Sequence, residues 1–272
     1  MRAWCNGSLV DPTQPALSVL DHGLTVGDGV FEAIKVTDGQ PFALTRHLRR
    51  LARSAVGLGL PEPDQDIVRA AIIEVLAEEQ LPYGRIRVTF TGGIGPLGSG
   101  RDAGEPSVLV VVTAAESPAP TTKAATVPWP RNERGALAGL KTTSYAENVM
   151  ALAYAQERGG SEAVFANTQG LLCEGTGTNV FCVLEGRVFT PPLSSGCLAG
   201  ITRELVLEWC DVLETDLTMG ELAAADEVFL TSTTRDVQGL HDLDGRLFDA
   251  QQPVTAQVRQ QWANMEPKDL DP

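Results

Sequence analysis

Turn signals spread over the whole chain constrain its fold more than any other feature. Asn6-Gly7, Asp38-Gly39, Glu185-Gly186 and Asp244-Gly245 each lie between two short apolar runs, which is the sequence signal of a β-hairpin. Hairpins join antiparallel strands, whereas a doubly wound parallel sheet needs a crossover between successive strands. Helical patterns alternate with these hairpins along the 272 residues. The sequence therefore predicts an α+β fold.

Between the turns, apolar residues recur with the period of either a helix or a strand. We expect a helix at residues 46–60 with Thr45 as its N-cap, and further helices at residues 64–79, 145–158, 202–210 and 254–262. Strands are predicted at residues 86–90, 108–112, 163–166 and 227–231.

A proline-rich segment near the middle of the chain predicts a domain boundary. Residues 116–122 (ESPAPTT) have the composition of a linker. We therefore expect a small N-terminal α+β domain at residues 1–117, a linker at residues 118–123 and a larger C-terminal domain at residues 124–272. A mass of 29.0 kDa is compatible with two domains of ordinary size.

Composition excludes several classes of protein. The net charge of −14 argues against nucleic acid as a partner, because phosphate backbones are bound by basic surfaces. The sequence lacks a run of roughly 20 apolar residues that could span a membrane. It also starts without a hydrophobic signal segment, so we expect a cytoplasmic protein. The five cysteines and three histidines show no metal-binding spacing, and we expect reduced, mostly buried thiols and no metal.

Lys141 is one of only four lysines, and its neighbours at residues 138–144 are small and neutral. Most lysines are solvated surface residues, but a lysine with a lowered pKa can form a Schiff base with an aldehyde. Glu174 follows 33 residues later, in a turn rich in glycine and threonine. It is either an exposed turn carboxylate or the partner of a buried cation. The pair has what pyridoxal 5'-phosphate chemistry needs: an amine for the aldehyde and a carboxylate that keeps the pyridine nitrogen protonated.

Three segments are candidates for binding a phosphate group. Residues 199–204 (AGITRE) open a helix, where the amides of Ile201 and Thr202 and the Thr202 hydroxyl could donate hydrogen bonds. Residues 231–234 (TSTT) supply four hydroxyls after a strand. Arg50 shares a basic helix face with Arg46, Arg49 and Arg53, and its spacing alone favours a solvated face.

Taken in this order, the motifs resemble those of the class IV aminotransferases, the fold-type IV pyridoxal-phosphate enzymes. That group includes branched-chain aminotransferase, D-amino acid aminotransferase and aminodeoxychorismate lyase. The resemblance runs nearly end to end and rests on residues 27–32 (GDGVFE), 47–51 (HLRRL), 141, 174–181 (EGTGTNVF), 200–203 (GITR) and 226–233 (DEVFLTST). It implies a small N-terminal domain, a larger C-terminal cofactor-binding domain with the cofactor between them, and a homodimer.

The resemblance also implies a role for individual residues. Lys141 is similar to the catalytic Schiff-base lysine, and Glu174 to the partner of the ring nitrogen. Tyr145 is similar to a tyrosine that reaches the cofactor's phenolic oxygen in some members. The implied phosphate ligands are Arg50, Ile201, Thr202, Ser232 and Thr233.

The implied reaction moves an amino group between an amino acid and a 2-oxo acid, with Lys141 transferring the Cα proton. The same cofactor residues would serve a 4-amino-4-deoxychorismate lyase, which releases pyruvate and gives 4-aminobenzoate. A third alternative is a protein that binds pyridoxal phosphate without catalysis. We favour the transaminase because that activity is the commoner one in the group.

Substrate-facing positions distinguish these alternatives only in part. Phe31 stands where D-amino acid aminotransferases have tyrosine, and residues 91–93 (TGG) lack their arginine, so we do not expect that type of enzyme. Phe31 and the turn at Thr233-Thr234 are compatible with the aromatic pocket of branched-chain enzymes. The lyase substrate has two carboxylates, and Arg101, Arg131 and Arg134 are the candidate cations for them.

Overall fold

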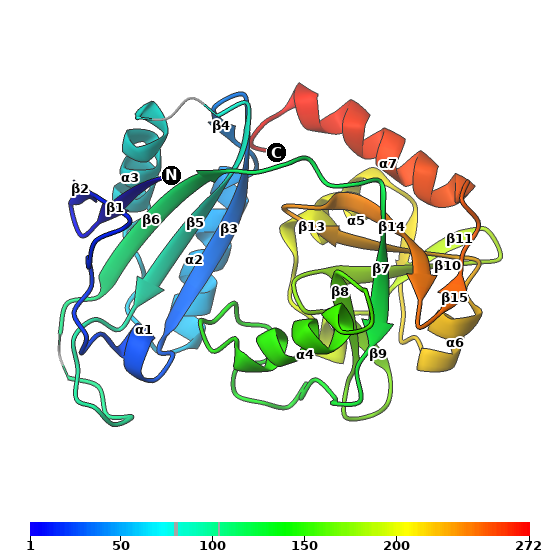
Figure 1. The fold of residues 1–272 in the computed structure, drawn as a ribbon, viewed down its shortest axis with the longest axis horizontal. Coiled ribbons are helices and arrows are strands. Elements are labelled where there is room, and N and C mark those ends of the chain that lie inside the picture. Colours follow the sequence, from blue (N-terminus) through cyan, green and yellow to red (C-terminus); the bar gives the residue numbers. More distant parts are fainter. Residues whose placement is uncertain (79–80, 103) are drawn as a thin grey trace. The chain divides into compact units, whose positions relative to one another are not determined.

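The computed structural model describes residues 1–78, 81–102 and 104–272, which divide into two compact units. Unit 1 contains Met1–Ser117, Leu140–Tyr145 and Leu270–Pro272, and unit 2 contains Pro118–Gly139 and Ala146–Asp269. Helices and strands mix within each unit (Figure 1), which confirms the α+β prediction. Among the described residues, no helix is both long and apolar enough to cross a membrane.

The division differs in two ways from the one expected from the linker. The segment Leu140–Tyr145, which includes Lys141, belongs to unit 1 although it lies beyond residue 124 in the sequence. Strand β7 (Thr121–Thr126) begins inside the expected linker, because it pairs in parallel with both β14 (Asp236–Leu243) and β8 (Glu162–Ala166). Pairing with distant strands therefore gives regular structure to a segment whose composition is typical of a linker.

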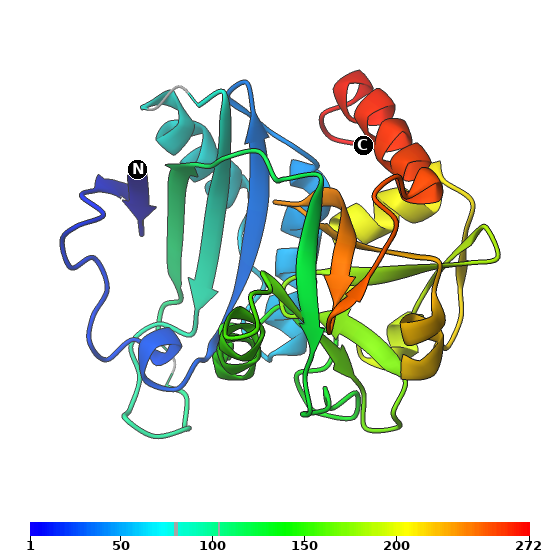
Figure 2. The ribbon, with the colours of Figure 1, turned by 45° about the vertical axis from the view of Figure 1, so that its right-hand side comes forward.

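The described strands of unit 1 form a six-stranded antiparallel sheet in the order β2-β1-β6-β5-β3-β4. Figure 2 shows β6, β5 and β3 side by side. Asn6 and Asp38 have positive φ values of 45° and 49°, as the tight turns after them require, and both predicted hairpins are confirmed. The strands are β1 (Arg2–Cys5), β2 (Ser8–Val10), β3 (Gly29–Thr37), β4 (Gln40–Pro41), β5 (Tyr83–Thr91) and β6 (Ser107–Ala114).

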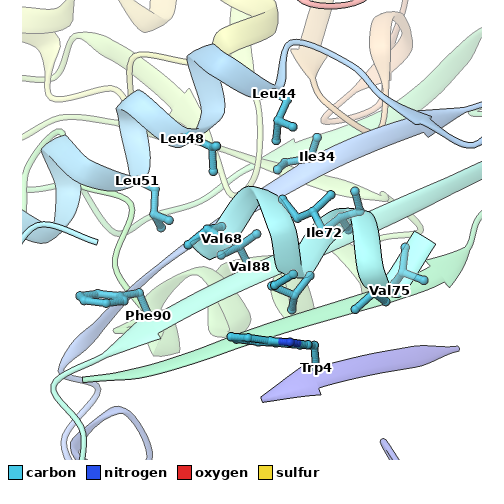
Figure 3. Packing of buried hydrophobic residues seen from close by; sticks show 14 of the residues in the cluster. Trp4, Ile34, Leu44, Leu48, Leu51, Val68, Ile72, Val75, Val88 and Phe90 are labelled. Carbon is cyan, nitrogen blue, oxygen red and sulfur yellow. The ribbon is translucent and has the colours of Figure 1, made fainter. Parts of the chain in front are cut away.

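Two helices, α2 (Leu44–Gly57) and α3 (Gln65–Ala77), pack on one face of this sheet and bury its core (Figure 3). Side chains alternate between the two faces of a strand. Val30, Ile34 and Val36 of β3 belong to this core, so Phe31 lies on the opposite face of the strand. Asp64 caps α3. The expected end of this helix, at Glu79, lies outside the described residues. A short helix, α1 (His22–Thr25), precedes β3.

The predicted N-cap of α2 is wrong. The helix begins at Leu44, and its N-cap is Ala43, which has a positive φ of 53° and a side chain that cannot accept a hydrogen bond. Thr45 donates from its backbone N and from Oγ1 to the carboxylate of Asp271, at 2.7 and 2.5 Å. The acceptor for the first turn therefore comes from a residue 226 positions away, which no local sequence signal reveals.

In the part of unit 2 that the structure describes, nine strands form a mixed sheet in the order β12-β11-β10-β13-β14-β7-β8-β9, with β15 paired to β14. The predicted hairpins at Glu185-Gly186 and Asp244-Gly245 are confirmed. The remaining strands are β9 (Leu172–Gly175), β10 (Asn179–Leu184), β11 (Arg187–Thr190), β12 (Val212–Glu214), β13 (Glu227–Ser232) and β15 (Arg246–Leu247). The helices are α4 (Ala146–Gln156), α5 (Ile201–Trp209), α6 (Met219–Ala224) and α7 (Pro253–Met265), with 3₁₀ turns at Leu193–Ser195 and Glu266–Lys268.

Candidate active site

Backbone contacts with β3 and α2 fix Lys141 within unit 1. The backbone N of Phe31 donates to the Lys141 carbonyl at 3.0 Å, and the Lys141 backbone N donates to Ser54 Oγ of α2 at 3.2 Å. Thr143 N donates to the Gly29 carbonyl at 2.8 Å, so the segment runs along the start of β3. The Lys141 amine lies 4.4 Å from the centroid of the Phe31 ring. The chain thus places a lysine amine against an aromatic ring.

Phe31 also contacts two other side chains of unit 1. The Tyr145 ring meets it edge-on, with centroids 5.2 Å apart and planes at 83°. The guanidinium carbon of Arg87, on β5, lies 3.9 Å from the centroid of the same ring. The structure therefore brings together three predicted site residues, Lys141, Phe31 and Tyr145, and adds Arg87. Arg87 was not among the predicted site residues, although the alternation of Arg85, Arg87 and Thr89 with apolar residues along β5 was a signal that could have indicated it.

Arg50 lies in a buried cluster of charged and polar groups. Its Nε and Nη2 donate to the two carboxylate oxygens of Glu32, at 2.8 and 2.7 Å, and His47 Nδ1 lies 2.7 Å from Glu32 Oε2. Burial would raise the pKa of Glu32, but the charge and hydrogen bonds of Arg50, with help from His47, lower this pKa to about 2. Burial lowers the pKa of His47. The cluster therefore pairs an ionised Glu32 with Arg50 and a neutral His47.

Arg101 uses its guanidinium to anchor a loop. It donates from Nε and Nη2 to the two carboxylate oxygens of Asp28, at 2.7 and 2.5 Å. It also donates to the carbonyls of Leu58 and Gly59, just after α2, at 2.9 and 3.0 Å. These hydrogen bonds from Arg101 lower the pKa of Asp28. A role for Arg101 in binding substrate stays a prediction.

Glu174 lies on β9 of unit 2, and its carboxylate is mostly buried. Its Oε2 accepts a hydrogen bond from the Leu198 backbone N at 2.9 Å, and its Oε1 lies 3.2 Å from Arg131 Nε. The Arg131 guanidinium also lies over the Phe165 ring, 4.1 Å from its centroid. An adjacent guanidinium favours the ionised form of a carboxylate. Glu174 is therefore suited to receive a protonated ring nitrogen.

Arg131 is shared between this carboxylate and helix α4. Its Nη1 donates to Glu147 and to Asn148 Oδ1, the latter at 2.9 Å. Arg131 and Arg134 were candidate cations for the carboxylates of the lyase substrate. In the structure Arg131 pairs with protein carboxylates, and the largely exposed Arg134 lies 3.5 Å from Glu133.

The predicted phosphate ligands of unit 2 lie on elements that pack together. Ile201 and Thr202 are buried in the first turn of α5, which follows the N-cap Gly200 and packs against β13. Ser232 ends β13, and Thr233 and Thr234 form the turn into β14. The first amides of a helix have no intrahelical acceptor, and a helix N-terminus attracts anions. These groups can hold a phosphate dianion.

The chemistry of these groups fits pyridoxal phosphate. Within unit 1 the Lys141 amine suits the aldehyde of this cofactor. Within unit 2 the Glu174 carboxylate suits its ring nitrogen, and the hydroxyls and helix amides suit its phosphate. Thr231, next to Ser232, has a buried hydroxyl that makes no hydrogen bond with any described residue. Such an orphaned polar atom normally has a partner in the functional state of a protein.

Three comparisons with known proteins each find aminotransferases. The family profile described as "Amino-transferase class IV" matches residues 29–242. The "Putative branched-chain-amino-acid aminotransferase" of Methanocaldococcus jannaschii is 33% identical over 98% of this chain and 97% of its own length, and D-alanine aminotransferase of Bacillus licheniformis is 30% identical over 95% of each. The crystal structure of branched-chain aminotransferase from Thermoproteus uzoniensis superposes with a TM-score of 0.89 at 29% identity, covering 97% of this chain and 94% of that one.

Proposed function

The chain belongs to the class IV aminotransferases, and on this premise we propose that it binds pyridoxal phosphate through Lys141 and moves an amino group between an amino acid and a 2-oxo acid. Its α+β structure is of fold-type IV, as in branched-chain aminotransferase. The observation that carries the proposal is the placement of the Lys141 amine, 4.4 Å from the Phe31 ring centroid, on a residue whose backbone N–H and carbonyl are both hydrogen-bonded. An amine placed in this way can attack an aldehyde and later move a proton at the substrate Cα.

Each residue then has a defined task. When bound, the cofactor supplies an aldehyde that condenses with amines and a pyridine ring that withdraws electrons from the substrate Cα. Glu174 would accept a hydrogen bond from the N–H of that ring, beside the Arg131 guanidinium. Ile201, Thr202, Ser232, Thr233 and Arg50 would bind the phosphate, and Tyr145 would supply a hydroxyl to the phenolic oxygen. Lys141 would move the proton from the substrate Cα to the former aldehyde carbon of the cofactor, as the transfer of an amino group requires.

We assign the substrate carboxylate to Arg87 rather than to Arg101. Arg87 shares the Phe31 ring with the Lys141 amine, so an anion bound there would lie near the reacting amine. Arg101 already donates to Asp28 and to two carbonyls. Phe31, and the turn at Thr234, would contact the rest of the substrate.

Two further proposals concern the state of the protein. We propose that it works as a homodimer, as the family resemblance implies. We also propose that it is cytoplasmic, which the five free thiols support, because disulfides are rare in reducing compartments.

The proposal is tested by titrating the protein, loaded with pyridoxal phosphate, with L-amino acids, D-amino acids and 4-amino-4-deoxychorismate. We expect an amino acid to convert the lysine-bound cofactor to pyridoxamine phosphate, with a 2-oxo acid as product, and the set that reacts gives the handedness. Formation of 4-aminobenzoate and pyruvate without this conversion would instead establish the lyase. A cofactor spectrum that no amine changes would overturn both enzymatic functions.

A further inference from the structure

The backbone N–H and the backbone carbonyl of Leu198 are each hydrogen-bonded to a side chain of a nearby strand. Its N–H donates to Glu174 Oε2 at 2.9 Å, and its carbonyl accepts a hydrogen bond from Asn179 Nδ2, also at 2.9 Å. Asn179 is the first residue of β10, and only 5% of its surface is exposed. One buried amide side chain thus binds the carbonyl of the residue whose backbone N–H contacts the Glu174 carboxylate.

Asn179 also packs against the start of α5. A Cβ atom added to Gly200, the N-cap of that helix, would lie 2.1 Å from Asn179 Oδ1. The Gly200 backbone N donates to the same Leu198 carbonyl, at 2.8 Å, that accepts from Asn179. Asn179 therefore contacts both the start of α5 and Leu198, the residue that donates to Glu174.

A third feature of this region points to a ligand. Asn179 lies directly opposite Thr231 in the antiparallel pair of β10 and β13, so both side chains are on the same face of the sheet. The Thr231 hydroxyl is 99% buried and has no hydrogen-bond partner among the described residues. An unsatisfied hydroxyl next to a helix N-terminus indicates that a polar group completes the region.

We propose that Asn179 is a positioning residue that fixes the first turn of α5 relative to Glu174 through the backbone of Leu198. Asn179 itself need not touch the cofactor. The inference rests on the proposed function, because it assigns the amides of α5 to the cofactor phosphate and Glu174 to the cofactor ring. It predicts that losing the Asn179 amide weakens recognition of the phosphate more than recognition of the ring.

The test compares the affinity of the apoprotein for pyridoxal phosphate with its affinity for pyridoxal, which lacks the phosphate. In Asn179→Ala we expect the dissociation constant for pyridoxal phosphate to rise by about 10- to 100-fold, the size expected when hydrogen bonds to a charged group are lost. The dissociation constant for pyridoxal should change by no more than a few fold, because Arg131 still contacts Glu174. Both constants are measured by absorbance titration, independently of turnover.

Asn167→Ala is the matched control. Asn167 is also buried, and its Nδ2 donates to the Ser195 carbonyl of the same loop at 3.2 Å. It lies outside the contacts that hold Leu198. Asn167→Ala should therefore reduce stability without changing the ratio of the two dissociation constants. An equal change of that ratio in both variants would overturn the proposal.

Gly200→Ala provides a second, independent perturbation. Its methyl group would collide with Asn179 Oδ1, so we expect the same selective loss of phosphate recognition. In the double variant Asn179→Ala/Gly200→Ala the collision is gone, and the two effects should be clearly less than additive. Full additivity would contradict a shared mechanism.

The failure of this inference can be distinguished from the failure of the proposed function. If borohydride reduction of the wild-type protein with pyridoxal phosphate leaves Lys141 unmodified, the proposed function is wrong and the positioning role falls with it. If Lys141 is modified but Asn179→Ala binds pyridoxal phosphate and pyridoxal in the wild-type ratio, only the positioning role is overturned.

Discussion

In unit 1, Glu32 accepts hydrogen bonds from Arg50 and His47 inside the core, whereas in unit 2 the backbone of Leu198 donates to Glu174. In unit 1 the buried ion pair with Glu32 orients Arg50. In unit 2 the backbone of Leu198 contacts both Glu174 and Asn179. Removing one partner of a buried ion pair leaves an uncompensated charge, so it costs stability. By contrast, we expect the loss of one hydrogen bond to the backbone of Leu198 to change geometry more than stability.

The largest effect is expected for Lys141→Ala. Lys141 is held by its backbone, so the variant should keep its fold and lose activity by about 10²- to 10⁴-fold, the range typical for a general base. Steady-state kinetics and urea unfolding would measure the two quantities separately. The control is Lys123→Ala, which removes a partly exposed lysine paired with Asp242 at 2.9 Å. A loss of several kcal/mol in stability would show that Lys141 is also structural.

Glu32→Gln tests the buried ion pair of unit 1. We expect the free energy of unfolding at neutral pH to fall by about 3–5 kcal/mol, because Arg50 would stay buried without a counter-charge. The pKa of Glu32 is lowered to about 2, so its stabilisation is present above its ordinary pKa of 4.5 and is lost as the pH falls from 4.5 towards 2. Unfolding curves across this range should converge for wild type and variant. Curves that stay parallel would show that Glu32 does not titrate there.

In unit 2, Glu174→Gln should reduce activity more than stability. We expect kcat to fall by about 10²-fold, because a neutral amide cannot keep the cofactor ring protonated, while stability changes by about 1 kcal/mol or less. The absorbance spectrum of the bound cofactor, followed against pH, reports the ring directly. Glu147→Gln removes the other carboxylate on Arg131 and should leave that spectrum unchanged. A large loss of stability in Glu174→Gln would erase the contrast between the units.

The smallest effect is expected for Thr231→Val. The Thr231 hydroxyl is buried without a partner among the described residues, so valine should stabilise the apoprotein by about 1 kcal/mol. Thermal unfolding of the apoprotein, with and without pyridoxal phosphate, measures this change. A clear destabilisation without cofactor would mean that the hydroxyl bonds to water or protein.

Local signals in the sequence predicted what local structure determines. Turns such as Asn6-Gly7 need positive φ, and these residue pairs correctly predicted the hairpins. Asp64 correctly marked the start of α3. The start of α2 was misplaced because its acceptor is Asp271. Strand β7 was missed because its pairing partners are distant in sequence.

The candidate site divides in the same way. The motifs around Lys141 and Glu174 named the residues that carry the chemistry, and those assignments stay predictions until tested. The sequence did not reveal that Arg131 contacts Glu174 or that Asn179 holds Leu198, because residues far apart in the chain make these contacts. Asn179 was visible within the segment at residues 174–181, but its spacing there did not indicate its partner.

The contact of Asp271 with Thr45 has a consequence for how the protein is made. Residues 270–272 belong to unit 1, as residues 1–117 do. All of unit 2 lies between these two parts of unit 1 in the sequence. Domains generally fold in order as they leave the ribosome. Helix α2 would therefore leave the ribosome early. The contact of Asp271 that stabilises its first turn can form only after nearly the whole chain has been made. During synthesis, unit 2 therefore has the opportunity to fold before unit 1 is finished.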